Sequence, residues 1–248
     1  MRRTLTALLA AAALLSACAA TAAPPTPVRP QVLETIPHDP TAFTQGLELA
    51  DGVLYEGTGL VGRSQLRELD PATGAVRRAV PIPAELFGEG ITVVGPTIWQ
   101  LTWQDGVALE WDRATLTLLR RVPYQGEGWG LCLDAGRDRL VRSDGTDRLH
   151  FHDPRTFAET GSVSVGVTNL NELECVDGQV WANVWQTDRI VRLDPETGAV
   201  TAEIDASGLL PAAQRADADV LNGIAHVTGD EYLLTGKWWP STFRVRLR

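Results

Sequence analysis

One local pattern recurs five times along the chain, and it constrains the fold more than any other feature. The copies are FTQGLEL at 43–49, FGEGITV at 87–93, GEGWGLCLD at 126–134, NLNELEC at 169–175 and VLNGIAH at 220–226. Aligning them puts five residues into one position, called here the mouth column: Gln45, Glu89, Trp129, Asn171 and Asn222. Their spacings of 44, 40, 42 and 51 residues are typical of a repeat architecture.

Each copy opens a unit of four short apolar segments separated by Gly, Asp-Pro and Asp-Gly turn signals. Turns of the Asp-Pro-x-Thr-Gly type, as at 70–74 and 194–198, favour a hairpin between the third and fourth segments. Helix signals are scarce, and 207–220 is expected to be a loop with a short helical turn. A unit of four strands and about 40 to 45 residues has the size of a propeller blade.

The sequence therefore predicts an all-β fold, a five-bladed β-propeller. The last unit ends at Arg248 after its third segment, and QVLETI at 31–36 is a candidate for the missing strand. An N-terminal strand in the last blade would close the ring and remove an open sheet edge. This closure favours a propeller over a β-sandwich, and we expect the propeller domain to span residues 31–248.

The first residues carry a targeting pattern. Two arginines, an apolar run and small residues predict a signal peptide over residues 1–17, too short to span a membrane comfortably. LSAC at 15–18 resembles a bacterial lipobox, in which Cys18 would be lipidated; the alternative is a soluble secreted protein cut nearby. The Ala/Pro-rich residues 18–30 are expected to form a tether with nothing to pack. We therefore expect an exported, membrane-anchored lipoprotein of the bacterial cell envelope, facing the periplasm or the outside.

The remaining cysteines, Cys132 and Cys175, lie at different phases of their repeat strands, one and two places after the first apolar residue. Since successive strand side chains face opposite ways, we expect them to point to different faces and to be two free buried thiols. An exported protein would also permit a disulfide.

The charge balance is acidic, with 22 Lys and Arg against 31 Asp and Glu. This balance argues against nucleic acid as a partner, because a phosphate backbone selects a basic face. We expect the chain to be a monomer.

The mouth column is the candidate functional site. The first strand of each blade lines the channel of a propeller, so the column residues should converge at one mouth. The second strands return to the same face and bring Gly59, Trp103, Gly145, Trp185 and Lys237, while Phe43 and Phe87 lie two places before the column. Apolar walls with a few convergent polar groups are what a small-ligand pocket needs.

Other conspicuous residues have structural interpretations. Tryptophans at blade-to-blade positions (Trp99, Trp111 and Trp181) and small residues after the column (Gly46, Gly90, Gly130 and Gly223) are expected to serve packing. Glu89 and Lys237 also have a structural alternative, in which each is one partner of an ion pair that only stabilises the fold. The four histidines, His38, His150, His152 and His226, form no metal-ligand spacing, and no nucleophile elbow, phosphate loop or Cys-x-x-Cys occurs. No metal or cofactor is predicted, although oxygen ligands leave little sequence trace and a structural calcium stays open.

Eight motifs, in order, resemble the glutaminyl-peptide cyclotransferases of the plant and bacterial type. They are FTQGLEL, LYEGTGLVGRSQLRELDPATG, FGEGIT, IWQLTWQ, LNELE, VWANVWQTDRIVRLDPETG, DVLNGIA and LTGKWWP. The resemblance covers about residues 31–248 and implies a five-bladed propeller. It also implies conversion of the N-terminal glutamine of peptides or proteins to pyroglutamate, with release of ammonia and without a catalytic zinc.

The resemblance implies roles for residues that the repeats had already selected. It implies three catalytic residues, Glu89, Lys237 and Asn171, and six pocket residues, Phe43, Gln45, Phe87, Trp103, Trp129 and Trp185. The chain departs from the family pattern at Val61, where an aromatic residue is expected in many members. This difference could change substrate preference at the rim without affecting the chemistry.

The residues also suggest a mechanism. We expect Glu89 to shuttle the proton, with a pKa raised by its apolar cup and opposed by Lys237. Lys237 and Asn171 would stabilise the oxyanion, and Gln45 and Asn222 would hold the substrate backbone. The alternatives are a non-catalytic, envelope-tethered propeller that binds peptide or protein partners, and a calcium-dependent, lactonase-like hydrolase.

Overall fold

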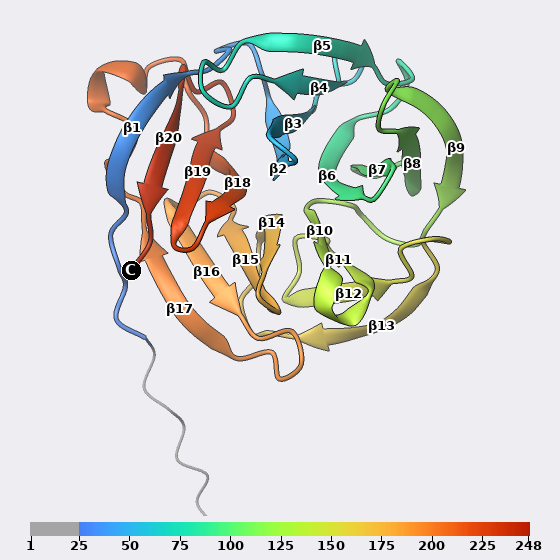
Figure 1. The fold of residues 1–248 in the computed structure, drawn as a ribbon. Coiled ribbons are helices and arrows are strands. Elements are labelled where there is room, and N and C mark those ends of the chain that lie inside the picture. Colours follow the sequence, from blue (N-terminus) through green and yellow to red (C-terminus); the bar gives the residue numbers. More distant parts are fainter. Residues whose placement is uncertain (1–24) are drawn as a thin grey trace, which may run out of the picture.

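The computed structural model describes residues 25–248, which form a five-bladed β-propeller as the repeats predict (Figure 1). The expected signal peptide and Cys18 lie outside the described residues. Each blade is a sheet of four strands, ordered from the channel outward and antiparallel throughout. No helix within residues 25–248 is long and apolar enough to cross a membrane.

The blades follow one another along the chain. Blade 1 holds β2 (Thr44–Ala50), β3 (Val53–Thr58), β4 (Gln65–Leu69) and β5 (Val76–Pro81). Blade 2 holds β6 (Gly88–Val94), β7 (Thr97–Thr102), β8 (Val107–Asp112) and β9 (Thr117–Pro123). Blade 3 holds β10 (Leu131–Asp134), β11 (Arg139–Ser143), β12 (Arg148–His152) and β13 (Glu159–Ser164), with a 3-10 turn at Ala135–Arg137.

Blade 4 holds β14 (Leu170–Val176), β15 (Gln179–Val184), β16 (Arg189–Leu193) and β17 (Val200–Asp205). Blade 5 holds β18 (Leu221–Thr228), β19 (Glu231–Gly236), β20 (Ser241–Arg246) and β1 (Gln31–Pro37). A 3-10 turn at Ala212–Gln214 lies in the expected insertion between blades 4 and 5.

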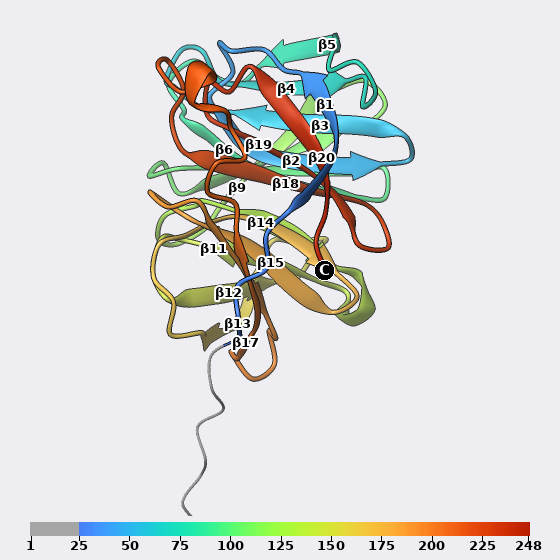
Figure 2. The same cartoon turned by 90° about the vertical axis from the view of Figure 1, so that its left-hand side faces the viewer.

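The ring closes as predicted, with the N-terminal strand completing the last blade. β1 pairs with β20 from Gln31 opposite Arg246 to Pro37 opposite Ser241. Both views show the blue β1 beside the red β20 (Figure 1 and Figure 2). Because the two ends of the chain share one sheet, opening the ring would cost a full set of ladder hydrogen bonds.

The chain packs against the propeller before β1 begins. Val28 N donates to the Glu203 carbonyl at 2.8 Å, and Asp205 N donates to the Val28 carbonyl at 2.9 Å. The Val28 side chain packs on the core between blades 4 and 5. The expectation of a tether with nothing to pack is therefore wrong at Val28, because the outer edge of β17 offers backbone partners.

Small residues after the mouth column bring neighbouring blades into contact, as expected for three of the four glycines. A Cβ on Gly46 would lie 2.5 Å from Ile91 N, and one on Gly90 would lie 2.7 Å from Leu131 N. A Cβ on Gly130 would lie 2.1 Å from the Asn171 carbonyl oxygen. Gly223 differs, since its backbone has a φ of 127°, which a side chain rarely tolerates.

In blade 4 the equivalent position is Glu172, which crosses the channel instead. Its two carboxylate oxygens accept the backbone N–H groups of Leu47 at 3.2 Å and Ile224 at 2.8 Å. The inner strands of the propeller thus find acceptors for N–H groups that have no neighbouring strand on the channel side.

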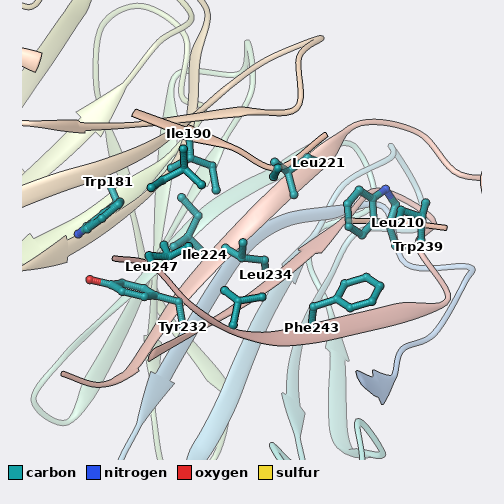
Figure 3. Packing of buried hydrophobic residues seen from close by; sticks show 13 residues of the cluster. Trp181, Ile190, Leu210, Leu221, Ile224, Tyr232, Leu234, Trp239, Phe243 and Leu247 are labelled. Carbon is teal, nitrogen blue, oxygen red and sulfur yellow. The ribbon is translucent and has the colours of Figure 1, made fainter. Parts of the chain in front are cut away.

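Apolar clusters fill the interfaces between blades. Figure 3 shows one between blades 4 and 5, where Trp181 points toward Tyr232 with ring centroids 5.1 Å apart. Trp99 and Trp111 occupy the corresponding interfaces around blade 2 and are buried. The prediction that these three tryptophans are structural is confirmed. Burial of each such side chain contributes about 1.5–3 kcal/mol or more.

Cys132 and Cys175 form a disulfide between blades 3 and 4, with Cα atoms 5.4 Å apart. The prediction of two free thiols is wrong. The two side chains do use opposite faces of equivalent strands, as predicted. In a ring, however, one face of each blade packs against the opposite face of the next blade. Both cysteines therefore lie in the interface between blades 3 and 4.

Candidate active site

The two sets of residues predicted to share a channel mouth do so. Gln45, Glu89, Asn171 and Asn222 are each the second residue of an inner strand, and Trp103, Trp185 and Lys237 directly follow second strands. Backbone hydrogen bonds join these positions, such as Trp103 N to the Phe87 carbonyl at 3.0 Å. Lys237 N likewise donates to the Val220 carbonyl at 3.0 Å. The same local pairing in different blades places the side chains at one end of the channel.

These side chains surround a cavity of about 300 Å³. Its walls are Phe43, Gln45, Leu60, Phe87, Glu89, Trp103, Trp129, Asn171, Trp185, Asp219 and Lys237. Nine of the ten residues predicted for the site therefore line one cavity. Asn222 does not line it.

Aromatic rings form most of the wall. Trp129 and Trp185 meet edge to face with centroids 5.4 Å apart, and Phe87 meets Trp103 at 5.5 Å. Glycines make room for them, because a Cβ on Gly145 would lie 2.6 Å from the Trp129 ring. Rings fixed by one another form a rigid apolar container for a small polar group.

A relay of amides lies under the cavity. Gln45 Nε2 donates to Glu89 Oε1 at 3.0 Å, and Asn222 Nδ2 donates to Gln45 Oε1 at 3.2 Å and to the Thr44 carbonyl at 3.0 Å. Asn222 is fully buried, so it lies behind Gln45 and not at the cavity surface. Its contact fixes which end of the Gln45 amide faces Glu89.

Burial raises the pKa of Glu89 well above its ordinary value; the Lys237 charge opposes this shift and the Glu127 charge adds to it. Burial also lowers the pKa of Lys237, against the charges of Glu89 and Asp219. Lys237 Nζ lies 4.8 Å from the centre of the Phe43 ring. The pKa of each group is therefore shifted toward the physiological pH range, which favours proton transfer at that pH.

Asn171 supplies hydrogen-bonding capacity that the protein does not use. Its Oδ1 atom is buried and has no hydrogen-bond partner within residues 25–248. Its Nδ2 group, the donor of the amide, also forms no hydrogen bond with any of residues 25–248, so Asn171 can donate to a polar ligand atom at the cavity wall.

The sequence interpretation did not identify Glu127, Leu60 and Asp219 as part of the site. Glu127 Oε2 accepts both indole N–H groups of Trp103 at 2.8 Å and Trp129 at 2.9 Å. A signal existed for Glu127, because it lies two places before the mouth column, as Phe43 and Phe87 do. Leu60 directly follows a mouth position, whereas Asp219 comes from the insertion, where no repeat alignment reaches.

The histidines have structural partners. His38 contacts Glu56 at 2.9 Å, His150 contacts Asp144 at 3.0 Å, and His152 contacts the Phe157 carbonyl at 3.0 Å. Within residues 25–248 no group of three or more His, Cys, Asp or Glu side chains is arranged to hold a metal ion.

The fold and the cavity define a class of protein, a five-bladed propeller with a buried carboxyl and a lysine in an aromatic cup at one channel mouth. The family model described as glutamine cyclotransferase matches residues 5–247, and the chain belongs to this family. A glutaminyl-peptide cyclotransferase of Arabidopsis thaliana is 38% identical over 230 residues, covering 88% of this chain and 71% of the relative. A crystal structure of Myxococcus xanthus glutaminyl cyclase, also 38% identical, matches with a TM-score of 0.80 over 90% of this chain and 98% of that chain.

Proposed function

We propose that this chain converts the N-terminal glutamine of peptides or proteins to pyroglutamate and releases ammonia. Its family membership supports the reaction. The observation that carries the proposal is Glu89, which is 4% exposed on the floor of an aromatic cavity and oriented by Gln45. A shielded carboxyl facing a cavity of this size suits a small substrate group that must exchange a proton.

The reaction needs one bond made, one bond broken and one proton moved. The α-amine nitrogen attacks the side-chain amide carbon, the five-membered ring closes, and the carbon–nitrogen bond to the amide NH₂ breaks. Glu89, as the carboxylate, takes the proton from the attacking nitrogen and then gives it to the departing nitrogen, which leaves as ammonia. The raised pKa of Glu89 makes it a stronger base for the first transfer and keeps the proton available for the second.

Binding geometry supplies the other part of the rate. An extended glutamine must curl before its own amine reaches the amide carbon, and holding it curled removes much of the entropic barrier. The rings of Trp103, Trp129 and Trp185 are placed to hold that shape. Negative charge develops on the amide oxygen, and Lys237 and Asn171 are the donors at the wall that would stabilise it.

The direct test is ammonia release from a peptide that begins with glutamine. We expect enzyme-dependent release, with loss of the mass of one ammonia from the peptide, in the presence and absence of EDTA. A peptide blocked by N-acetylation is the control, because its amine cannot attack. Failure of a well-folded sample to release ammonia would favour the alternative, a propeller that binds peptides without converting them.

Glu89→Gln tests the proton shuttle. The amide keeps the shape of Glu89 but cannot accept the proton, so kcat should fall by about 10²–10⁴-fold. Thermal unfolding should show that the variant is folded, since it replaces a buried acid by a neutral group of equal size. Turnover near that of the wild type would contradict the role of Glu89.

We further propose that the chain is exported and anchored by lipid on Cys18. The signal pattern of residues 1–17 supports this, and so does the Cys132–Cys175 disulfide, because such bonds persist in oxidising compartments. Labelling of cells with a fatty acid should mark the wild-type protein and not Cys18→Ser. Label on Cys18→Ser would exclude this residue as the lipid attachment site, and an unlabelled wild type would exclude the anchor.

A further inference from the structure

A second cavity adjoins the aromatic one at the channel mouth. It has a volume of about 330 Å³ and shares Phe43 and Leu60 with the first cavity. Its remaining walls are mostly polar and include Thr41, Gln65, Arg63 and Arg67. A chain whose first residue fills the aromatic cavity can therefore continue over Phe43 and Leu60 into this groove, which we call the rim groove.

The loop that forms one side of the rim groove is held in place. Leu60 has a φ of 87°, a left-handed conformation that a leucine adopts only under constraint. Ser64 supplies the constraint, since its N–H and its hydroxyl both donate to the Leu60 carbonyl at 2.8 Å. The Ser64 hydroxyl also accepts Gly88 N at 3.0 Å. The loop is thus tied to the strand that carries Glu89, so the groove and the cavity keep a fixed relation.

The two arginines of the rim groove differ in how much of their charge is compensated. Arg67 Nη1 contacts Asp39 at 2.9 Å and Glu56 at 3.5 Å, and its Nε donates to Gln65 at 2.7 Å. Arg63 is exposed and forms no side-chain hydrogen bond or ion pair with any of residues 25–248. The groove therefore offers one cation that a ligand can pair with at no loss of an internal contact.

We propose that the rim groove binds the residues that follow the cyclising glutamine and that Arg63 selects an acidic side chain among them. This inference rests on the proposed function and names a class of substrate, peptides with Asp or Glu at the second or third position. Val61, two residues before Arg63 on the same loop, is 62% exposed.

The test compares C-terminally amidated peptides that differ only in charge after the glutamine: Gln-Glu-Ala, Gln-Ala-Glu, Gln-Lys-Ala and Gln-Ala-Ala. For the wild type we expect kcat/KM to be roughly fivefold higher for the better acidic peptide than for the basic one, as an exposed ion pair can provide. The difference should appear in KM and shrink at high salt, because it reflects binding outside the reacting centre.

Arg63→Gln should abolish this preference, and Arg63→Glu should reverse it. Arg155→Gln is the control, because Arg155 is also exposed but lies in the turn between β12 and β13 of blade 3, and its removal should leave the preference intact. Equal kcat/KM for acidic and basic peptides in the wild type would overturn this inference, and so would a preference that survives in Arg63→Gln. In either case, release of ammonia would still support the proposed function. Absence of ammonia from every peptide, Gln-Ala-Ala included, would overturn both.

Discussion

Gln45 Nε2 donates a hydrogen bond of 3.0 Å to Glu89 Oε1, and this contact joins the inner strands of blades 1 and 2 at the channel mouth. Asn222 of blade 5 orients the Gln45 amide from behind. Three mouth-column residues from three blades thus form one relay that ends on the carboxyl group. The relay supplies a donor to the charged form of Glu89, in an environment whose burial otherwise favours the neutral acid.

Removal of that donor should shift the pH profile of the reaction. Hydrogen bonds to a carboxylate favour the charged form, so Gln45→Leu should raise the pKa of Glu89 further. Activity requires the carboxylate, and the acidic limb of kcat/KM should therefore move to higher pH. Gln179→Leu, a matched change on β15, should leave the limb in place. A limb that stays unchanged in Gln45→Leu would show that this contact does not control the ionisation.

Glu127 should act on the site in two separable ways. Burial raises its pKa, but hydrogen bonds from Trp129, Gln104 and Trp103 outweigh this and hold the pKa below its ordinary value. Its charge in turn raises the pKa of Glu89. Glu127→Gln removes the charge and keeps an acceptor for the indoles, so the acidic limb should move to lower pH with KM nearly constant.

Glu127→Ala removes the acceptor as well. The indoles of Trp103 and Trp129 then lose their common partner, and KM should rise by about fivefold or more, since each of the two lost hydrogen bonds is worth about 1 kcal/mol. Tryptophan fluorescence should change in Glu127→Ala more than in Glu127→Gln. Equal KM values in the two variants would show that the contact does not position the rings.

Much of this site follows from the repeats because strand periodicity is local. Four of the five mouth-column residues are the second residue of their inner strand, so alignment alone selects Glu89, Asn171 and Gln45. The N-terminal strand was predictable for a related reason, since a unit that lacks one strand leaves an edge to be covered. These inferences need only the order of elements and the direction of side chains within one blade.

Relations between blades were harder to predict. The strand periodicity of one sheet places the two cysteines on different faces, whereas their contact depends on the face that each blade presents to the next. Asp219 reaches the cavity from an insertion that no other blade repeats. Asn222 occupies the same column as Glu89 but lies behind Gln45, because its neighbours in blade 1 cover it. Packing across the ring decides these positions, and it leaves no periodic signal.

The Cys132–Cys175 disulfide should stabilise the propeller by linking two blades. It joins residues 43 apart, and a crosslink of this span contributes about 2–4 kcal/mol, mainly by restricting the unfolded chain. The double variant Cys132→Ala, Cys175→Ala should unfold at a lower urea concentration than the wild type. A reductant should lower the urea midpoint of the wild type but not that of the variant. Free thiols at both positions in the unreduced, unfolded protein would contradict the bond.

Three glutamates in the channel should make stability fall as pH rises. Burial raises the pKa of Glu172 and Glu174 well above the ordinary value, and it raises that of Glu48 to about 7. Each accepts a backbone N–H from another blade: Glu48 from Val93, Glu172 from Leu47 and Ile224, and Glu174 from His226. These hydrogen bonds lower the pKa values, but burial outweighs them. The folded state therefore holds protons that the unfolded state has already released.

The sign of the effect follows from this difference in bound protons. A carboxyl whose pKa is raised on folding contributes most below its unfolded pKa, near 4.5, and loses that contribution as pH rises through the folded pKa. The unfolding free energy should thus decline between pH 5 and 8, and Glu48→Gln should reduce the decline by about 1 kcal/mol or more, since one pKa unit corresponds to about 1.4 kcal/mol. Glu34→Gln, an exposed change on β1, should leave the slope unaltered. Urea unfolding of the three proteins at several pH values measures this, and parallel curves for wild type and Glu48→Gln would exclude Glu48 as a source of the decline.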